Sequence, residues 1–390
     1  MTIEGELIVV LDWDGRRVAR VAVRSTRPLS AARLLIARTP DQACAAVALL
    51  FSVCAKAQSV AAAGAAEAAL AIAPPSGTLA WREFAVVAET VQEYLWRLLI
   101  DWPRLMGQEA QPFPVAEARR LLAAGLKGFA GASALPGAIL DEPGPAMRAE
   151  LAAGLDAIAA KTIYGQRLQD WLTLDDLAGF GRWLQCADTA VAARFSALLA
   201  SDPELGRSAV ALMPYPPPAA MHRELVSAME AGPEFMRTPQ WRGEAVETGA
   251  LARTHDHPLV AAGLERWGQS VASRLLARLV ELALLLRRLG GRDPLEARSN
   301  QCVPLRRGDG WASVETARGL LMHRVRIAAG RVAEYRIIAP TEWNFHPRGA
   351  LVRGLEGYCA PDAGALSQAA RLVAYSLDPC VAFRVEVGHA

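Results

Sequence analysis

Two cysteines, Cys54 and Cys380, each stand at one end of a segment with the length of a C-x-x-C motif, which is typical of metal sites. A metal-binding pair with this spacing has sulfur at both ends, but here Phe51 and Phe383 occupy the other ends. Thiolate sulfur is the ligand type that holds soft metals such as low-valent iron or nickel. Because each segment contributes one sulfur, a shared site requires the two ends of the chain to converge. We predict that Cys54 and Cys380 face each other across a cavity and bind metal.

The remaining cysteines and histidines carry weaker signals. Four cysteines show no disulfide spacing, and we interpret them as small buried hydrophobic side chains: Cys44, Cys186, Cys302 and Cys359. His255 and His257 form an H-x-H pair without a third ligand nearby, which favours a helix start or a surface feature and leaves their role open. No P-loop, dinucleotide fingerprint, zinc quartet or serine-nucleophile elbow is present in the sequence.

Composition and charge exclude several classes of protein. Of 390 residues, 52% are hydrophobic, which is enough for a large core without disulfides. Basic and acidic residues nearly balance at 42 and 40, so nucleic acid is not an expected partner. Polar and charged residues interrupt the apolar segments 43–73 and 275–286, and no leader pattern begins the chain. We therefore expect no membrane association and a cytoplasmic location.

Two β-hairpins are predicted, one toward each end of the chain. Strand-forming residues at 7–11 and 17–23 flank Asp14-Gly15, which is a strong short-range hairpin signal. Similar residues at 323–327 and 331–338 flank Ala329-Gly330. Both ends of the chain are therefore expected to contain short β-sheets.

Helical periodicity dominates the rest of the chain. Thr39-Pro40 has the form of a helix cap followed by proline at the first helical position, and apolar spacing predicts long helices over 82–106 and 258–288. We predict a predominantly helical α+β fold that forms one domain. Its expected regions are 1–108 with the first hairpin and the Cys54 helix, 112–218 as a variable periphery, and 249–390 with a long helix, the second hairpin and Cys380.

Several segments resemble motifs of the nickel–iron hydrogenase large subunit, and together they cover both ends of the chain. In the N-terminal part, residues 3–5 resemble R-[IV]-E-G-H and residues 50–58 resemble R-I-C-G-V-C-x-x-x-H. In the C-terminal part, the matching motifs are E-A-P-R-G-A-L-G-H at 315–323, V-P-[ST]-T-W-N-x-x-P-R at 339–348 and S-F-D-P-C-x-x-C-x-x-H at 376–386. The resemblance implies the large-subunit fold.

The resemblance also implies a ligand set that is half complete. Cys54 falls on a bridging ligand and Cys380 on a terminal nickel ligand, whereas Phe51 and Phe383 replace the other two thiolates. With two of four sulfurs lost, we expect neither nickel nor hydrogen turnover. Iron that already carries cyanide and carbon monoxide, Fe(CN)2(CO), needs fewer protein ligands, so two cysteines would suffice.

Five further residues match the surroundings of that iron group. Arg318 matches an arginine that donates to cyanide, and its guanidinium stays charged at any relevant pH. Thr341, which follows Pro340, would offer a hydroxyl and a backbone N–H to the second cyanide. Asp378 matches an acidic residue of the same pocket, and Glu4 matches a glutamate that relays protons near the metals.

With its large-subunit motifs and two missing cysteines, this sequence resembles the HupK/HoxV type of hydrogenase accessory protein. Such proteins are thought to act as scaffolds or carriers while the iron group is assembled. The resemblance therefore implies a non-catalytic carrier of Fe(CN)2(CO), with hydrogenase maturation proteins and the large subunit as partners. Two alternatives stay open. One is a divergent redox subunit, either a hydrogenase or a relative of the quinone-site subunit of complex I, and the other is a metal-free decoy that binds chaperones.

Overall fold

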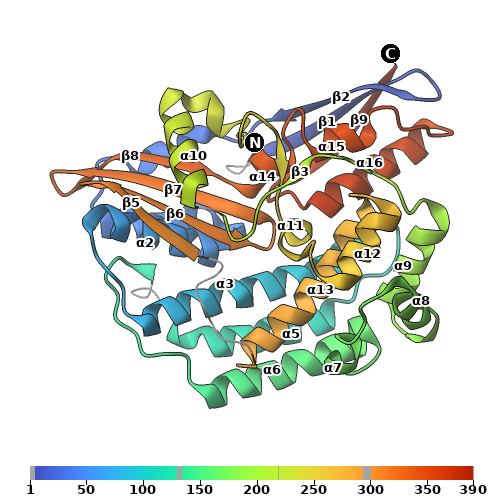
Figure 1. Ribbon diagram of the computed structural model, residues 1–390, viewed down its shortest axis with the longest axis horizontal. Coiled ribbons are helices and arrows are strands. Elements are labelled where there is room, and N and C mark those ends of the chain that lie inside the picture. Colours follow the sequence, from blue (N-terminus) through green and yellow to red (C-terminus); the bar gives the residue numbers. More distant parts are fainter. Residues whose placement is uncertain (1–4, 130–133, 218, 293–299, 390) are drawn as a thin grey trace.

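Two larger β-sheets, one of three and one of four strands, and a group of long helices organise the chain (Figure 1). The structure is a computed structural model and describes residues 5–129, 134–217, 219–292 and 300–389. Glu4, one of the predicted site residues, lies outside these ranges.

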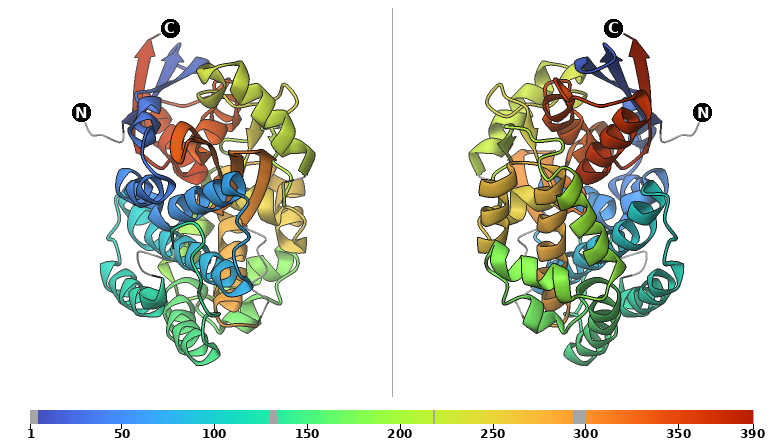
Figure 2. Two further views of the ribbon diagram at one scale, coloured as in Figure 1. Left: turned by 90° about the vertical axis from the view of Figure 1, so that its left-hand side faces the viewer. Right: turned by 90° about the vertical axis from the view of Figure 1, so that its right-hand side faces the viewer.

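The first sheet joins the two ends of the chain. The predicted N-terminal hairpin is confirmed: β1 (Glu6–Trp13) and β2 (Val18–Ser25) are antiparallel neighbours. A third strand, β9 (Ala382–His389), pairs in parallel with β1 from the other side, and Figure 2 shows it beside the hairpin. Alternate residues of β1 are buried, so one face of this sheet covers the core. The parallel pairing brings the segment that follows Cys380 next to the N-terminus.

The Cys54 region forms a bent pair of helices. The predicted cap is confirmed, since Thr39 accepts a hydrogen bond from the Gln42 amide at the start of α1 (Pro40–Leu50). A short 3-10 turn, η2 (Ser52–Cys54), then leads into α2 (Ala55–Leu70). A second 3-10 segment, η1 (Leu29–Leu35), precedes α1.

Helix α2 packs flat against the second sheet because its alanine-rich surface permits a close approach. Four antiparallel strands form this sheet in sequence order: β5 (Asn300–Arg306), β6 (Asp309–Thr316), β7 (Gly319–Ala328) and β8 (Arg331–Ile338). At Gly310 an added Cβ would lie 2.2 Å from the carbonyl oxygen of Ala65, so β6 and α2 touch through backbone there. The predicted second hairpin, β7–β8, is confirmed. Strand β6 is buried along its whole length and therefore lacks the alternating pattern that indicates a strand.

Long helices cross the centre of the molecule. Helix α3 (Ser76–Trp96) continues into a π-helical segment, η3 (Arg97–Asp101), and then into α4 (Trp102–Leu105), which agrees with the long helix predicted over 82–106. The single helix predicted over 258–288 is wrong. The chain forms α12 (Pro258–Trp267), breaks at Gly268 with φ 64°, and restarts as α13 (Val271–Leu289) with Ser270 as its cap.

The middle of the chain forms a series of helices, of which those over residues 112–171 lie at the end remote from the first sheet (Figure 1). These are α5 (Pro112–Gly125), η4 (Leu126–Gly128), α6 (Pro145–Ala159), η6 (Ala160–Tyr164), α7 (Leu168–Trp171), α8 (Leu177–Cys186) and α9 (Ala190–Ser201). The elements beyond them are β3 (Ala211–Leu212), α10 (Ala219–Ala231), η7 (Pro233–Met236), β4 (Val246–Glu247), α11 (Ala250–Thr254), α14 (Pro340–Asn344), α15 (Ala350–Leu355) and α16 (Ala363–Leu377). The predicted division of the chain into regions stays a prediction.

Within the described residues, no helix on its own combines the length and apolar character needed to cross a membrane. Taken together, the helical segments 40–50 and 52–70 meet those criteria, but they are bent by 98° at their junction.

Candidate functional site

Cys54 and Cys380 line one cavity, which we call the thiol cavity. Its volume is about 120 Å³. Most of its wall is apolar and includes Ala32, Phe51 and Ile337. Cys54 is 8% exposed, and Cys380 is partly exposed. The two segments that carry single cysteines are therefore brought to one place by the fold.

The buried position of Cys54 at the start of α2 keeps its thiol protonated. Helix N-termini usually favour a thiolate, but here the carboxylate of Glu89 accepts from the backbone N–H groups of Lys56 and Ala57, each at 2.9 Å. Burial raises the pKa of Cys54 to about 12, and the negative charge of Glu89 contributes. Burial likewise raises the pKa of Glu89 to about 7, although the two amides oppose that shift.

A chain of hydrogen bonds leads from the sulfur of Cys54 into the second sheet. Gln58, one helical turn after Cys54, donates from Nε2 to Sγ at 3.6 Å. Its Oε1 lies 2.9 Å from Nε2 of His323, and Nδ1 of His323 lies 2.8 Å from the hydroxyl of Tyr335. Burial lowers the pKa of His323 to about 3, so the imidazole is neutral. The simplest proton arrangement has Tyr335 donating to His323 and His323 donating to Gln58, which holds the Gln58 amide toward sulfur.

Thr341 makes a two-way contact with Cys380. Its hydroxyl donates to Sγ of Cys380 at 2.9 Å and accepts from the backbone N–H of Cys380 at 3.2 Å. Pro340 begins the short helix α14 that carries Thr341. The contact holds the partly exposed sulfur of Cys380 against the start of α14.

Arg27 is a site residue that the sequence patterns missed. It lines the thiol cavity and forms an ion pair of 2.5 Å with Glu342, one residue after Thr341. Burial disfavours its charge, but Cys380, Glu342 and Cys54 outweigh that effect and raise the pKa of Arg27. A positive charge therefore lies in the wall of the cavity that both cysteines line. No local spacing signals it, because Arg27 follows β2 in a loop.

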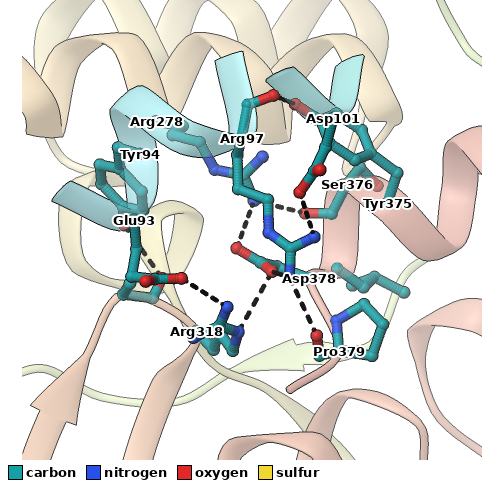
Figure 3. A network of polar contacts seen from close by, with 12 residues as sticks. Glu93, Tyr94, Arg97, Asp101, Arg278, Arg318, Tyr375, Ser376, Asp378 and Pro379 are labelled. Carbon is teal, nitrogen blue, oxygen red and sulfur yellow. Dashed lines mark hydrogen bonds and ion pairs between the residues drawn. The ribbon is translucent and has the colours of Figure 1, made fainter. Parts of the chain in front are cut away.

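Arg318 lines an adjoining cleft and not the thiol cavity. Figure 3 shows its polar contacts. It is 4% exposed, and its Nη2 lies 2.7 Å from Glu93 while its Nε lies 3.3 Å from Asp378. Burial opposes its charge, but Asp378 and Glu93, followed by Cys54 and Cys380, raise the pKa of Arg318. Its Nη1 has no hydrogen-bond partner among the residues that the structure describes. A buried charged donor without an acceptor is the feature expected beside an anionic ligand.

Asp378 holds three guanidinium groups together, as Figure 3 shows. Its carboxylate oxygens lie 2.7 Å from Arg97, 3.3 Å from Arg318 and 3.5 Å from Arg278. Burial alone would favour the neutral acid, but the arginines lower the pKa of Asp378 below its ordinary value. Its left-handed backbone, with φ 56°, ends α16 and turns the chain toward Cys380. Arg97 also binds Asp101 at 2.7 Å, an i,i+4 spacing readable from the sequence.

The predicted site residues do not all surround the thiol cavity. Thr341 touches Cys380 but lines a neighbouring cavity, and Arg318 and Asp378 line a further small cavity instead of the thiol cavity. Pro340 is buried and acts through the start of α14. The expectation that all these residues line one pocket is therefore too simple, since the segment carrying Cys380 separates two openings.

The structure also places the two phenylalanines that replace thiolates and the two histidines of the H-x-H pair. Phe51 lines the thiol cavity with Cys54, whereas Phe383 lines the adjoining cleft. His255 lies 3.0 Å from the carbonyl of Ala252, and His257 precedes α12 as its cap residue. Among the described residues, no three His, Cys, Asp or Glu side chains converge as a metal site.

Sequence comparison relates the chain to hydrogenase expression/formation proteins. HupK of Rhizobium leguminosarum bv. viciae is 31% identical, over 95% of this chain and 93% of that protein. HoxV of Cupriavidus necator is 30% identical, over 93% of this chain and 92% of that protein. The chain belongs to the HupK/HoxV family of hydrogenase expression/formation proteins.

The HupK/HoxV-family chain is also related in fold to hydrogenases themselves. Residues 271–385 match the family described as Nickel-dependent hydrogenase. The Ni-Fe-Se hydrogenase from D. vulgaris Hildenborough in the as-isolated oxidized state has a TM-score of 0.66 at 16% identity, with 96% of this chain and 98% of that chain covered. The Ni-Fe-Se hydrogenase from Desulfomicrobium baculatum has a TM-score of 0.66 at 15% identity, with 95% of each chain covered. The predicted α+β, predominantly helical large-subunit fold is confirmed.

Proposed function

We propose that this HupK/HoxV-family protein holds Fe(CN)2(CO) as cargo during hydrogenase assembly and does not itself turn over hydrogen. A role in hydrogenase formation agrees with the names of its relatives. The observation that carries the proposal is the presence of Cys54 and Cys380 in the wall of one cavity, although they come from opposite ends of the chain.

The ligand chemistry supports iron that brings ligands of its own. Two thiolates leave most of a coordination sphere to be filled, and cyanide and carbon monoxide would fill it. A cavity needs a volume of about 10–15 Å³ to hold one water molecule, so the thiol cavity, with about 120 Å³, accommodates a group of several heavy atoms. Its largely apolar wall suits carbon monoxide and limits access of water to the iron.

The charges around the cavity support an anionic cargo. Cyanide ligands and thiolates together carry negative charge, and Arg27 and Arg318 place two guanidinium groups near the sulfurs. The unpartnered Nη1 of Arg318 is a donor that a cyanide nitrogen would satisfy. Hydrogenase maturation proteins that build or receive the iron group are the expected partners, and the cytoplasm remains the expected location.

Infrared spectroscopy of the protein purified from a hydrogenase-producing host tests the proposal. Metal-bound cyanide and carbonyl absorb where proteins do not, so a loaded protein should show bands of both ligands. Cys54→Ala and Cys380→Ala should each abolish them. Cys44→Ala is the matched control, because Cys44 is a buried cysteine outside the thiol cavity, and it should retain the bands.

Two results would contradict the carrier function. Bands that persist in both cavity variants would mean that these sulfurs do not hold the iron. A wild-type protein without bands, isolated while the host is producing active hydrogenase and still bound to maturation proteins, would favour the metal-free decoy.

A further inference from the structure

A second opening lies beside Cys380, and we call it the arginine cleft. Its volume is about 730 Å³, and it is lined by five arginines: Arg97, Arg104, Arg119, Arg318 and Arg371. The arginine cleft and the thiol cavity share part of their walls, namely Ser52, Val53, Cys380 and Val381. Cys380 is therefore reachable from both openings.

The carboxylates of the arginine cleft are already engaged. Asp101 binds Arg97 at 2.7 Å, and Glu93 binds Arg318 at 2.7 Å. The third, Glu89, accepts two backbone hydrogen bonds from the start of α2. The positive charges of the other three arginines of the cleft, Arg104, Arg119 and Arg371, are therefore not balanced by these carboxylates.

Three arginines at the rim are exposed and free to bind an anion. Arg104 belongs to α4, Arg119 to α5 and Arg371 to α16. Across the described parts of the chain, none of the three has a carboxylate within 4 Å, whereas many other arginines are ion-paired. Guanidinium groups recognise carboxylates through paired hydrogen bonds.

We propose that the arginine cleft binds an acidic segment of a protein partner and thereby brings that partner to Cys380. This inference rests on the proposed function, because the segment would dock the protein that delivers or receives the iron group. The rim arginines come from three separate helices, so they suit several carboxylates spread along a chain rather than one small ion. Trp96, Tyr375 and Phe383 also line the cleft and offer apolar contacts to such a segment.

Fluorescence anisotropy with a labelled six-glutamate peptide tests the inference on the full-length protein. The triple variant Arg104→Glu, Arg119→Glu and Arg371→Glu should weaken binding about tenfold or more, because three attractive contacts become repulsive. The matched control carries the same charge change on exposed arginines of the first sheet and η1, with Arg20→Glu, Arg24→Glu and Arg33→Glu. The control should bind within about twofold of the wild type.

Three outcomes would overturn the inference. The peptide does not bind the wild type, or both triple variants lose affinity equally, or inorganic phosphate or ADP at equal concentration displaces the peptide completely. The last result would indicate a small-anion site instead. Cys54→Ala separates this inference from the carrier function, because Cys54 lines the thiol cavity but not the arginine cleft. It should abolish the infrared bands but leave peptide affinity unchanged, so each proposal fails by a different measurement.

Discussion

The hydroxyl of Thr341 both donates to the sulfur of Cys380, at 2.9 Å, and accepts from its backbone N–H, at 3.2 Å. This double contact ties α14 to the segment that joins α16 to β9. The orientation of a sulfur near the C-terminus therefore depends on a residue in a different element.

Replacing Thr341 by valine should loosen this connection. The shape is nearly conserved, but the sulfur loses a donor and the amide of Cys380 loses its acceptor, so we expect the free energy of unfolding to fall by about 1–3 kcal/mol. Urea denaturation measures the change. Thr341→Ser keeps the hydroxyl and is the control; equal stability of the valine and serine variants would contradict the structural role.

Replacing Asp378 by asparagine should destabilise the protein strongly. It would leave the guanidinium groups of Arg97, Arg278 and Arg318 without their shared carboxylate. Removing one partner of a buried ion pair costs about 3–5 kcal/mol. Asp101→Asn is the control, because the Asp101 side chain is 25% exposed and its loss should cost about 1 kcal/mol or less.

The effect of Asp378→Asn should also depend on pH. The folded-state pKa of Asp378 is lowered, so its stabilising contribution is complete above the unfolded-state pKa of about 3.9. It is lost as the pH falls from there through the folded-state pKa. The stability difference from the wild type should stay constant between about pH 8 and 5 and shrink below about pH 4. A difference that shrinks already at pH 6 would argue against an ionised Asp378.

The thiol of Cys54 should react slowly with iodoacetamide. Its pKa of about 12 means that little thiolate is present near neutral pH, and the alkylation rate should still rise above pH 9. Glu89→Gln removes a negative charge that raises this pKa, so Cys54 should react faster in that variant. Mass spectrometry of labelled peptides gives the rates. Cys186 is exposed, and not buried as predicted, so it serves as the internal reference. A Cys54 rate that levels off below pH 9 would contradict the buried, protonated thiol.

His323 should make stability fall on acidification. Its folded-state pKa of about 3 lies below the unfolded value of about 6.5, so the unfolded chain gains a proton first. Stability should therefore decrease by up to about 1.4 kcal/mol per pH unit below pH 6.5 until the folded-state pKa is reached. His323→Gln should flatten the profile by that amount. Parallel profiles for the two proteins, measured by urea denaturation from pH 7 to 4, would show that His323 is not buried in its neutral form.

Local patterns anticipated the parts of the fold that local interactions determine. The β1–β2 turn, the Thr39 cap and the β7–β8 hairpin each depend on a few neighbouring residues, and each was predicted. The break at Gly268 was missed because apolar residues continue at helical spacing on both sides of it. Strand β9 was missed because its pairing with β1 involves the opposite end of the chain.

Three features can be read directly along the chain: the two single thiols, the phenylalanines at the other end of each C-x-x-C spacing, and the resemblance to the hydrogenase large subunit. The position of Cys380 between an apolar cavity, lined also by Arg27, and a basic cleft, lined also by Arg318, appears only after the chain has folded. The physical reason is that burial and charge compensation arise between side chains from separate elements. Glu89 reaches the start of α2 from α3, and Asp378 gathers arginines from three segments, without any spacing along the chain that records these contacts.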